Sequence, residues 1–350
     1  MKFHKAFQLN GQSFQNSEEL LGYSCQWSQE LHSFLQQWLN ESRELKVMTS
    51  GSTGVPKEII LRKEHMKNSA KATGDFLKLG ENTKALLCLS PKYIAGKMML
   101  VRAMELGWNL EVVKESSSPL EELDKVFDFV AMVPLQLSNS LQLLHRIKTL
   151  IVGGAAVSPG LCQSLQGKSC VVYATYGMTE TTSHIAFKKL NHCQNENESE
   201  VYRVLPEVCI SLDDRGCLVI DAKKVASERI TTNDFVQIIA KDAFYWLGRQ
   251  DSVVNSGGIK LIPEQIELKL VEIISQRFFL AGLPDDILGE KLVLLIEDSG
   301  KSVSNPKKVK QFLKKANLSK FEYPKEIHFV KKFAETETKK IQRKSTLEMI

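Results

Sequence analysis

Hydrophobic and polar residues follow strand and helix periods in turn over the first half of the chain. Four short apolar runs have the length and composition of buried strands: residues 85–89, 109–113, 127–133 and 150–152. Segments 63–77 and 97–104 have helical spacing, and the apolar residues of 17–45 suit amphipathic helices. Strands that alternate with helices predict an α/β layer structure, in which sheets are flanked by helices.

The last hundred residues carry a second, smaller set of expected elements. In order, we expect a hairpin at 253–258, a helix at 264–275, strands at 278–282 and 291–297, and a second helix at 306–315. Residues 322–327 lead into a final strand. This order predicts a small α+β domain.

Composition narrows the class of protein. The 350 residues are enough for two domains, and a net charge of +5 from 46 basic and 41 acidic residues does not imply a nucleic-acid partner. The N-terminus lacks the apolar segment of a signal peptide and no window reaches membrane-spanning length, so we expect no membrane insertion. Seven cysteines without a Cys-x-x-Cys pair suit reduced thiols and predict a cytoplasmic protein.

The strongest local pattern lies at residues 48–57, which read Met-Thr-Ser-Gly-Ser-Thr-Gly-Val-Pro-Lys. Gly51 and Gly54 let successive backbone N–H groups face one concavity, and Lys57 adds a charge suited to phosphate. Hydroxyl donors come from four neighbours: Thr49, Ser50, Ser52 and Thr53. The lysine follows proline and precedes glutamate, which excludes the loop of P-loop NTPases. An apolar run at 59–61 disfavours a plain linker, so the segment predicts a phosphate-binding loop.

Further motifs follow this loop in a fixed order. Two of them are strong: Tyr-Gly-Met-Thr-Glu-Thr at 176–181 and Leu-Gly-Arg-Gln-Asp at 247–251. A later segment at 334–343 reads Ala-Glu-Thr-Glu-Thr-Lys-Lys-Ile-Gln-Arg. Together with the loop they resemble the adenylate-forming superfamily of acyl-CoA synthetases, free-standing adenylation domains and luciferases. The resemblance spans roughly residues 47–343. More chain precedes the loop in that family, so the resemblance implies a version shortened at its N-terminus.

The resemblance implies two domains. Residues 1–248 would form a large α/β domain that binds ATP and an acid. Residues 249–350 would form a small mobile α+β domain that carries the catalytic lysine and turns about a hinge at Asp251.

The resemblance also implies a nucleotide site. Lys57 and the loop would hold phosphates, Thr179 would reach the α-phosphate, and Glu180 would supply the hard oxygen ligand that Mg²⁺ prefers. Asp234 would accept both ribose hydroxyls, and Arg249 would contact ribose and the α-phosphate. Two segments would line the adenine pocket: Gly153, Gly154 and Ala155, with Tyr176, Gly177 and Met178.

Two motifs depart from the family pattern. Asn233 stands where glycine is usual, an exchange we expect to be mild because asparagine tolerates left-handed backbone. In the last motif Ala334 replaces proline and Lys339 replaces glycine. By register, Lys340 before Ile341 is the implied catalytic lysine.

An acid pocket and a thiol path complete the implied site. The expected pocket residues are Tyr93, Gly96, Lys97, Arg102 and His184. Lys97 and Arg102 are the only cations of an apolar helical segment, so one of them would meet a substrate carboxylate; the alternative is a pair of surface charges with buried stems. His184 would be a pocket wall, although lone histidines are more often structural. Gly257 and Gly258 would let a pantetheine arm pass.

The implied reaction has two steps and uses ATP, Mg²⁺ and coenzyme A. A carboxylic acid attacks the α-phosphorus of ATP, and the thiol of coenzyme A then displaces AMP. Within the superfamily the motifs are most similar to the o-succinylbenzoate–CoA ligases of menaquinone biosynthesis. Another acyl or aryl acid, a carrier-protein thiol in place of coenzyme A, and an inactive nucleotide-binding relative stay open, as does a monomer or a homodimer.

Overall fold

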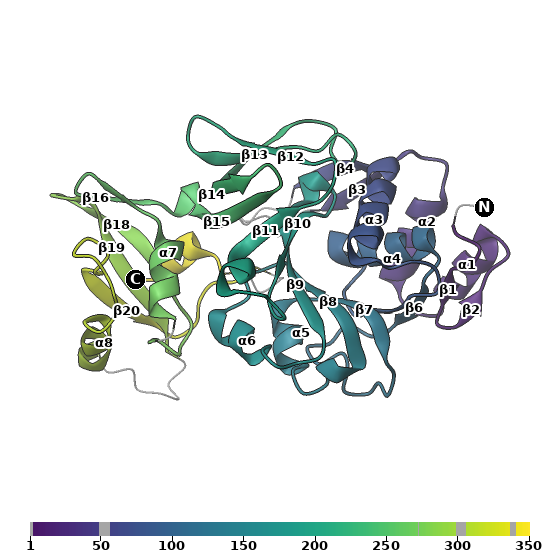
Figure 1. Cartoon of the computed structure of the whole chain (residues 1–350), viewed down its shortest axis with the longest axis horizontal. Coiled ribbons are helices and arrows are strands. Elements are labelled where there is room, and N and C mark those ends of the chain that lie inside the picture. Colours follow the sequence, from purple (N-terminus) through teal and green to yellow (C-terminus); the bar gives the residue numbers. More distant parts are fainter. Residues whose placement is uncertain (1–2, 49–56, 272, 299–305, 337–340) are drawn as a thin grey trace.

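The computed structural model describes residues 3–48, 57–271, 273–298, 306–336 and 341–350. These residues form a large sheet, a smaller sheet and a two-stranded hairpin, with helices packed against both sheets. Figure 1 shows the smaller sheet at one end of the molecule and the large sheet at its centre. The mixed α/β fold class expected from the sequence is confirmed.

The large sheet has thirteen described strands. Their bounds are β1 Gln8–Leu9, β2 Gln12–Ser13, β5 Lys84–Leu87, β6 Asn109–Val112, β7 Phe127–Met132, β8 Ile147–Val152, β9 Val171–Gly177, β10 His184–Lys189, β11 Val201–Val204, β12 Cys209–Leu212, β13 Cys217–Asp221, β14 Ile230–Ala240 and β15 Ala243–Arg249. They lie in the order β12-β13-β14-β15-β11-β10-β9-β8-β7-β5-β6-β1-β2. Strands β6, β5, β7, β8 and β9 pair in parallel, whereas β10, β11 and β12 to β15 pair antiparallel.

Helices cover the parallel part of this sheet on both faces (Figure 1). The helices and short 3-10 turns between residues 17 and 252 have these bounds: α1 Ser17–Ser24, α2 Gln29–Leu39, α3 Lys63–Leu77, α4 Ile94–Leu106, α5 Pro134–Asn139, α6 Pro159–Ser164, η1 Leu144–Arg146, η2 Thr179–Thr181, η3 Glu196–Glu200 and η4 Gln250–Ser252. Successive side chains of β7 enter two different cores: Phe129 and Ala131 pack with α2, α3 and α4, and Val130 and Met132 pack with α5. Because successive side chains of a strand point to opposite faces of the sheet, β7 packs against the helices on both faces.

The helices predicted in this part agree with the structure except at one end. The helix expected at 63–77 has those bounds in α3, and the one expected at 97–104 lies within α4. Helical structure expected across 17–45 ends at Leu39, and a strand begins at Glu44. Asn40 accounts for the stop, because its Oδ1 accepts the backbone N–H of Ser42 at 2.9 Å in competition with helical hydrogen bonds.

A separate hairpin of β3 (Glu44–Met48) and β4 (Glu58–Arg62) leads into and out of the predicted phosphate loop. Residues 49–56 of that loop lie outside the described residues. β4 contacts η2, so the hairpin lies beside the motif at 176–181.

The smaller sheet has five described strands and three described helices. Their bounds are β16 Val254–Ser256, β17 Ile259–Leu261, β18 Phe278–Asp285, β19 Gly289–Glu297, β20 Glu326–Val330, α7 Pro263–Leu270, α8 Pro306–Leu313 and α9 Arg343–Leu347. The order is β17-β16-β19-β18, and β20 pairs in parallel with β19. Apolar residues of α7 and α8 share one core with β19, and Leu347 of α9 packs on the core of the opposite face.

Two helices of this sheet end earlier than expected. α7 ends at Leu270 instead of continuing to residue 275, and α8 ends at Leu313 instead of 315. The residues after α7 include Val271, Ile273 and Ile274, whose β-branched side chains disfavour helix. Among the helices that the structure describes, none is long and apolar enough to cross a membrane.

Candidate nucleotide and acid site

Three of the predicted segments meet at one edge of the large sheet. β5, β7, β8 and β9 are parallel, so their carboxyl ends lie at the same edge. Tyr93 and the first turn of α4 with Gly96 follow β5, Gly153 to Ala155 follow β8, and 176–181 spans the end of β9. Ligands of open parallel sheets bind at this edge. The structure therefore brings the adenine-wall and acid-pocket segments together.

Close backbone packing explains two of the predicted glycines. A Cβ added to Gly177 would lie 2.3 Å from the Ser183 carbonyl oxygen, and one added to Gly153 would lie 2.5 Å from Thr175 Oγ1. Gly154 has a φ of +83°, which favours glycine. The absence of a side chain at Gly177 and Gly153 thus lets the start of β10 and the Thr175 side chain pack closely against the ends of β9 and β8.

Asp234 joins three strands of the site. Its Oδ2 accepts the hydroxyl of Tyr176 at 2.7 Å, and its Oδ1 accepts the indole N–H of Trp246 at 3.1 Å. Arg249 lies opposite Asp234 in the β14–β15 pair, with its Nη1 3.7 Å from Oδ1. Burial and the charge of Asp234 raise the pKa of Tyr176, so its hydroxyl stays a donor at neutral pH. Tyr176, predicted to contact adenine, therefore lies next to Asp234 and Arg249, which separate motifs predicted to contact the ribose.

Asn233 does not use the left-handed backbone that asparagine tolerates. Asn233 lies within the extended strand β14 and is not among the described residues with positive φ. The Asn233 Oδ1 accepts a hydrogen bond from Arg215 Nη1 at 3.2 Å.

Arg249 also reaches the segment between the two sheets. Its Nε and Nη2 donate to the two carboxylate oxygens of Asp251, at 2.8 and 2.9 Å. This bidentate pair, together with the nearby charge of Asp234, raises the pKa of Arg249. Asp251 lies in η4, between the last strand of the large sheet and the first strand of the smaller one.

The turn after β9 exposes one carboxylate. Glu180 is exposed in η2 and makes no hydrogen bond or ion pair with any residue that the structure describes. Thr181, which the sequence analysis did not single out, accepts the Met178 N–H at 3.0 Å and donates toward the Met178 and Ser183 carbonyls. It fixes the turn that presents Thr179 and Glu180. An uncommitted carboxylate of this kind fits a hard cation such as Mg²⁺.

Arg102 is a fully buried guanidinium of α4 beside the start of β10. Its Nε donates to Thr73 Oγ1 at 3.3 Å and its Nη2 donates to Ser183 Oγ at 2.9 Å. The described residues place no carboxylate against it, and burial lowers its pKa to about 9. A buried cation without a counter-charge is costly, which points to an anion from outside the protein.

His184 lies beside this cation and is neutral. The Thr73 hydroxyl donates to the Ser69 carbonyl at 2.9 Å, so in its 3.0 Å contact with His184 Nε2 the imidazole must donate. Burial and the charge of Arg102 lower the pKa of His184 well below its ordinary value. Thr73 and Ser183 thus join Arg102 and His184 in one buried polar group.

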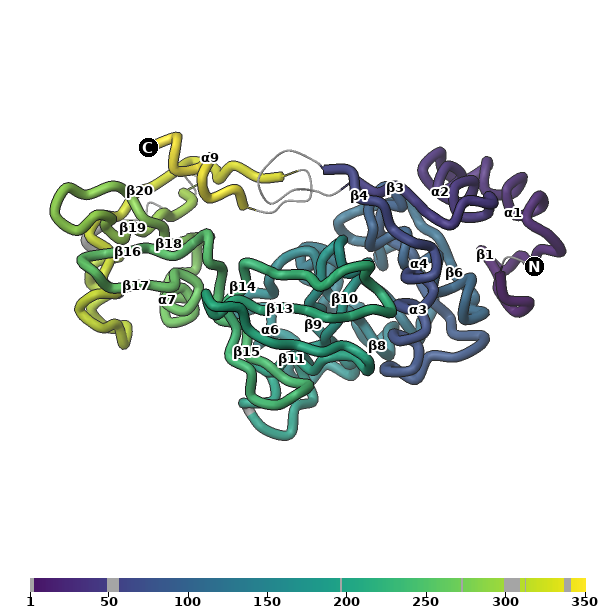
Figure 2. Tube along the Cα trace, turned by 90° about the horizontal axis from the view of Figure 1, so that it is seen from above, coloured from purple at the N-terminus to yellow at the C-terminus, as the bar shows by residue number. Residues whose placement is uncertain are grey.

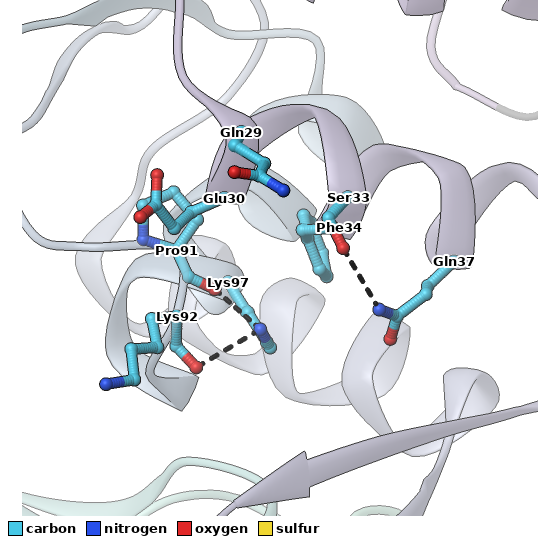
Figure 3. Close-up of a pocket in the computed structure, with 8 residues that line it drawn as sticks. All are labelled: Gln29, Glu30, Ser33, Phe34, Gln37, Pro91, Lys92 and Lys97. Carbon is cyan, nitrogen blue, oxygen red and sulfur yellow. Dashed lines mark hydrogen bonds between the residues drawn. The ribbon is translucent and has the colours of Figure 1, made fainter.

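Lys97 lies on another face of α4, away from Arg102. Its Nζ donates to the carbonyls of Pro91 and Lys92 at 2.5 and 3.3 Å, and it lies 5.4 Å from the Phe34 ring centre. These residues line a cavity of about 300 Å³ between α2 and the loop after β5 (Figure 3). Burial lowers the pKa of Lys97 to about 8. The structure therefore separates the two cations that the sequence left as alternatives.

The remaining predicted residues lie elsewhere or outside the described ranges. Gly257 and Gly258 form the turn between β16 and β17, both with positive φ. Lys57 is exposed just before β4. Thr49 to Gly54 and Lys340 lie outside the described residues. Figure 2 shows α9, which follows Lys340, on the same side of the molecule as the β3–β4 hairpin.

The chain belongs to the AMP-binding enzyme family, whose profile matches residues 47–224, half of its length. An acyl-CoA synthetase (AMP-forming)/AMP-acid ligase II-like protein from Dyadobacter fermentans has a solved structure. It is 40% identical, covers 91% of this chain and 93% of its own, and has a TM-score of 0.60.

Two further comparisons concern ligases of one substrate. The 2-succinylbenzoate–CoA ligase of Haemophilus influenzae is 25% identical over 298 residues, which cover 79% of this chain and 64% of the relative. The o-succinylbenzoate coenzyme A synthetase of Bacillus subtilis, solved in complex with ATP and magnesium ion, is 17% identical with a TM-score of 0.75. That alignment covers 95% of this chain and 82% of the synthetase, and it shows a shared fold. The chain spans less than two thirds of the Haemophilus relative.

Proposed function

We propose that the protein is an AMP-forming acid–thiol ligase. In the first step a carboxylate oxygen attacks the α-phosphorus of ATP, and the bond to diphosphate breaks to give an acyl-adenylate. In the second step a thiol attacks the acyl carbon and AMP leaves. The observation that carries this proposal is the meeting of Tyr176, Asp234 and Arg249 at the carboxyl edge of the sheet, in a chain of the AMP-binding enzyme family.

The residues at this edge supply the electrostatics of the first step. Thr179 and Arg249 would contact the α-phosphate, and Lys340 would neutralise charge that develops between the carboxylate and phosphorus. Glu180 would hold Mg²⁺, which screens the phosphate charge when bound. Asp234 would accept the ribose hydroxyls. Each of these roles is carried over from the family motifs.

We propose o-succinylbenzoate, an aromatic keto-dicarboxylate, as the acid. Arg102 supports an acid with a second carboxylate, because its buried guanidinium has no acidic partner among the described residues. The carboxylate that reacts must stay near ATP, so the partner of Arg102 would be the other one. The similarity to 2-succinylbenzoate–CoA ligases favours the same substrate.

We propose coenzyme A as the thiol and a hinge at Asp251 for its access. Gly258 has open space around the position of an added Cβ, so the β16–β17 turn could lie against a narrow pantetheine arm. Turning of a small domain, residues 249–350, would withdraw Lys340 and bring this turn to the acyl group. We place the reaction in the cytoplasm, in keeping with seven cysteines that are all free thiols.

A panel of acids tests the reaction and its substrate. Purified protein, ATP, Mg²⁺ and coenzyme A are mixed with o-succinylbenzoate, benzoate, a medium-chain fatty acid or malonate, and diphosphate and AMP are measured. We expect the highest kcat/KM with o-succinylbenzoate. A better acid would replace this substrate, and adenylate formation without turnover by coenzyme A would point to a carrier-protein thiol. Binding of ATP with no diphosphate from any acid would overturn the ligase proposal in favour of an inactive relative.

A further inference from the structure

Trp246 is a site residue that no family motif assigns. It lies in β15, three positions before Arg249, and its indole N–H donates to Asp234 Oδ1 at 3.1 Å. On the other oxygen, the Tyr176 hydroxyl donates to Oδ2 at 2.7 Å. The Asp234 carboxylate is therefore held by one neutral donor on each oxygen, from β9 and from β15.

This arrangement leaves part of the carboxylate free. An ionised carboxylate offers about four acceptor positions, two on each oxygen. The two donors take one position on each oxygen, and Arg249 Nη1 at 3.7 Å from Oδ1 is too far for a hydrogen bond. One acceptor position remains on each oxygen. Two adjacent acceptors match the two neighbouring hydroxyls of a ribose.

The donors are themselves held in place. The Tyr176 ring packs edge-on against Phe244 and Tyr202, with centroid distances of 5.3 and 5.7 Å. Trp246 packs against the same apolar cluster, and its position is fixed by the pairing of β14 with β15. The side chain of Asp234 is only 9% exposed, so little water competes for its oxygens. Neither donor can leave without opening a packed cluster.

We propose that Trp246 is a positioning residue for nucleotide selection: with Tyr176 it fixes the rotation of the Asp234 carboxylate, so that both ribose hydroxyls are accepted at once and a 2′-deoxynucleotide is disfavoured. The inference rests on the proposed function, because it takes Asp234 as the ribose acceptor.

The test measures binding of ATP and of 2′-deoxy-ATP by isothermal titration calorimetry to the wild-type protein and to Trp246→Phe. We expect the substitution to raise the Kd for ATP about 3- to 10-fold, as for loss of one hydrogen bond to a charged group, and to leave the Kd for 2′-deoxy-ATP nearly unchanged. Trp27→Phe is the matched control, since Trp27 is exposed and its indole donates to no described residue. It should leave both affinities unchanged.

Further variants separate the possible failures. Asp234→Asn should weaken ATP binding; an unchanged Kd in this variant would remove the ribose site and with it the proposed function. Two results would overturn the positioning role. In one, Asp234→Asn weakens ATP binding while Trp246→Phe leaves it unchanged; in the other, Trp246→Phe weakens the binding of ATP and of 2′-deoxy-ATP equally. Tyr176→Phe keeps the ring and removes the second donor, so it should show the same selective loss even if Trp246→Phe folds poorly.

Discussion

At the scale of single residues, Arg102 allows substrate binding to be separated from fold stability. Replacing Arg102 with Met removes a buried cation that has no described acidic partner, so stability should stay the same or rise by about 1–4 kcal/mol. The KM for o-succinylbenzoate should rise by roughly tenfold or more, since a charge-assisted hydrogen bond is lost. Steady-state kinetics and thermal unfolding measure the two effects.

Lys97→Met provides the control for this prediction. Lys97 is also a largely buried cation of α4, but it faces the cavity beside Phe34 and not Ser183. Its substitution should leave the KM for the acid unchanged. An unchanged KM in both variants would mean that neither cation meets the substrate.

His184 predicts a dependence of stability on pH. Burial keeps it neutral in the folded protein, whereas the unfolded chain binds a proton near the ordinary pKa of 6.5. The unfolded state therefore holds more protons below pH 6.5, and stability falls as the pH falls, by at most about 1.4 kcal/mol per pH unit for this one group. His184→Gln should make the slope of unfolding free energy between pH 5 and 6.5 shallower, as measured by urea denaturation. Equal slopes in the two proteins would contradict a neutral buried imidazole.

Sequence patterns predicted the residues of the proposed nucleotide site but not all of their partners. Tyr176, Asp234 and Arg249 lie in recognisable motifs, and the structure brings them together. Trp246 lies outside every motif, and its bond to Asp234 depends on strand pairing that shifts register between Phe235 and Val236. Such a shift cannot be seen in a single sequence.

At the scale of elements, the turn from β9 to β10 depends on Gly177. Its register partner is His184, and an added Cβ would lie 2.5 Å from His184 Cα and 2.3 Å from the Ser183 carbonyl oxygen. Gly177→Ala should push β10 away, lower stability by about 1–3 kcal/mol and raise the KM for ATP. Gly160→Ala in α6, where an added Cβ meets nothing within 4 Å, is the control and should change neither. Wild-type kinetics in Gly177→Ala would show that the turn tolerates the shift.

Helices and strands with strong apolar periodicity could be predicted from the sequence. Which side chains of neighbouring elements contact each other could not. The bounds of α3 and the succession of strands β5 to β8 along the chain follow from apolar spacing. On α4, however, Lys97 and Arg102 are five residues apart, which places them about 140° apart around the helix. Only the packing of α3 and α2 on different sides of α4 decides that Arg102 meets Thr73 and Lys97 meets Phe34.

At the scale of the whole molecule, the assignment of the catalytic lysine to Lys340 by sequence register predicts that the C-terminal part of the chain is needed for catalysis but not for ATP binding. Lys340→Ala should lower the rate of acid-dependent diphosphate exchange by about 100-fold or more and leave ATP affinity within twofold. Lys339→Ala is the matched neighbour and should retain most of the activity. Diphosphate exchange and calorimetric ATP binding measure the two quantities. If Lys339→Ala were the inactive variant, the assignment by register would be wrong.

The guanidinium of Arg249 binds Asp251 between the sheets and lies beside Asp234, the proposed ribose acceptor. A ligand phosphate that draws this side chain away from Asp251 would loosen the connecting segment. Conversely, any rearrangement that breaks the Asp251 pair would alter affinity for the nucleotide by the same factor, as thermodynamic linkage requires. Through this one arginine, the orientation of the two halves of the molecule and the binding of nucleotide at the proposed site would each depend on the other.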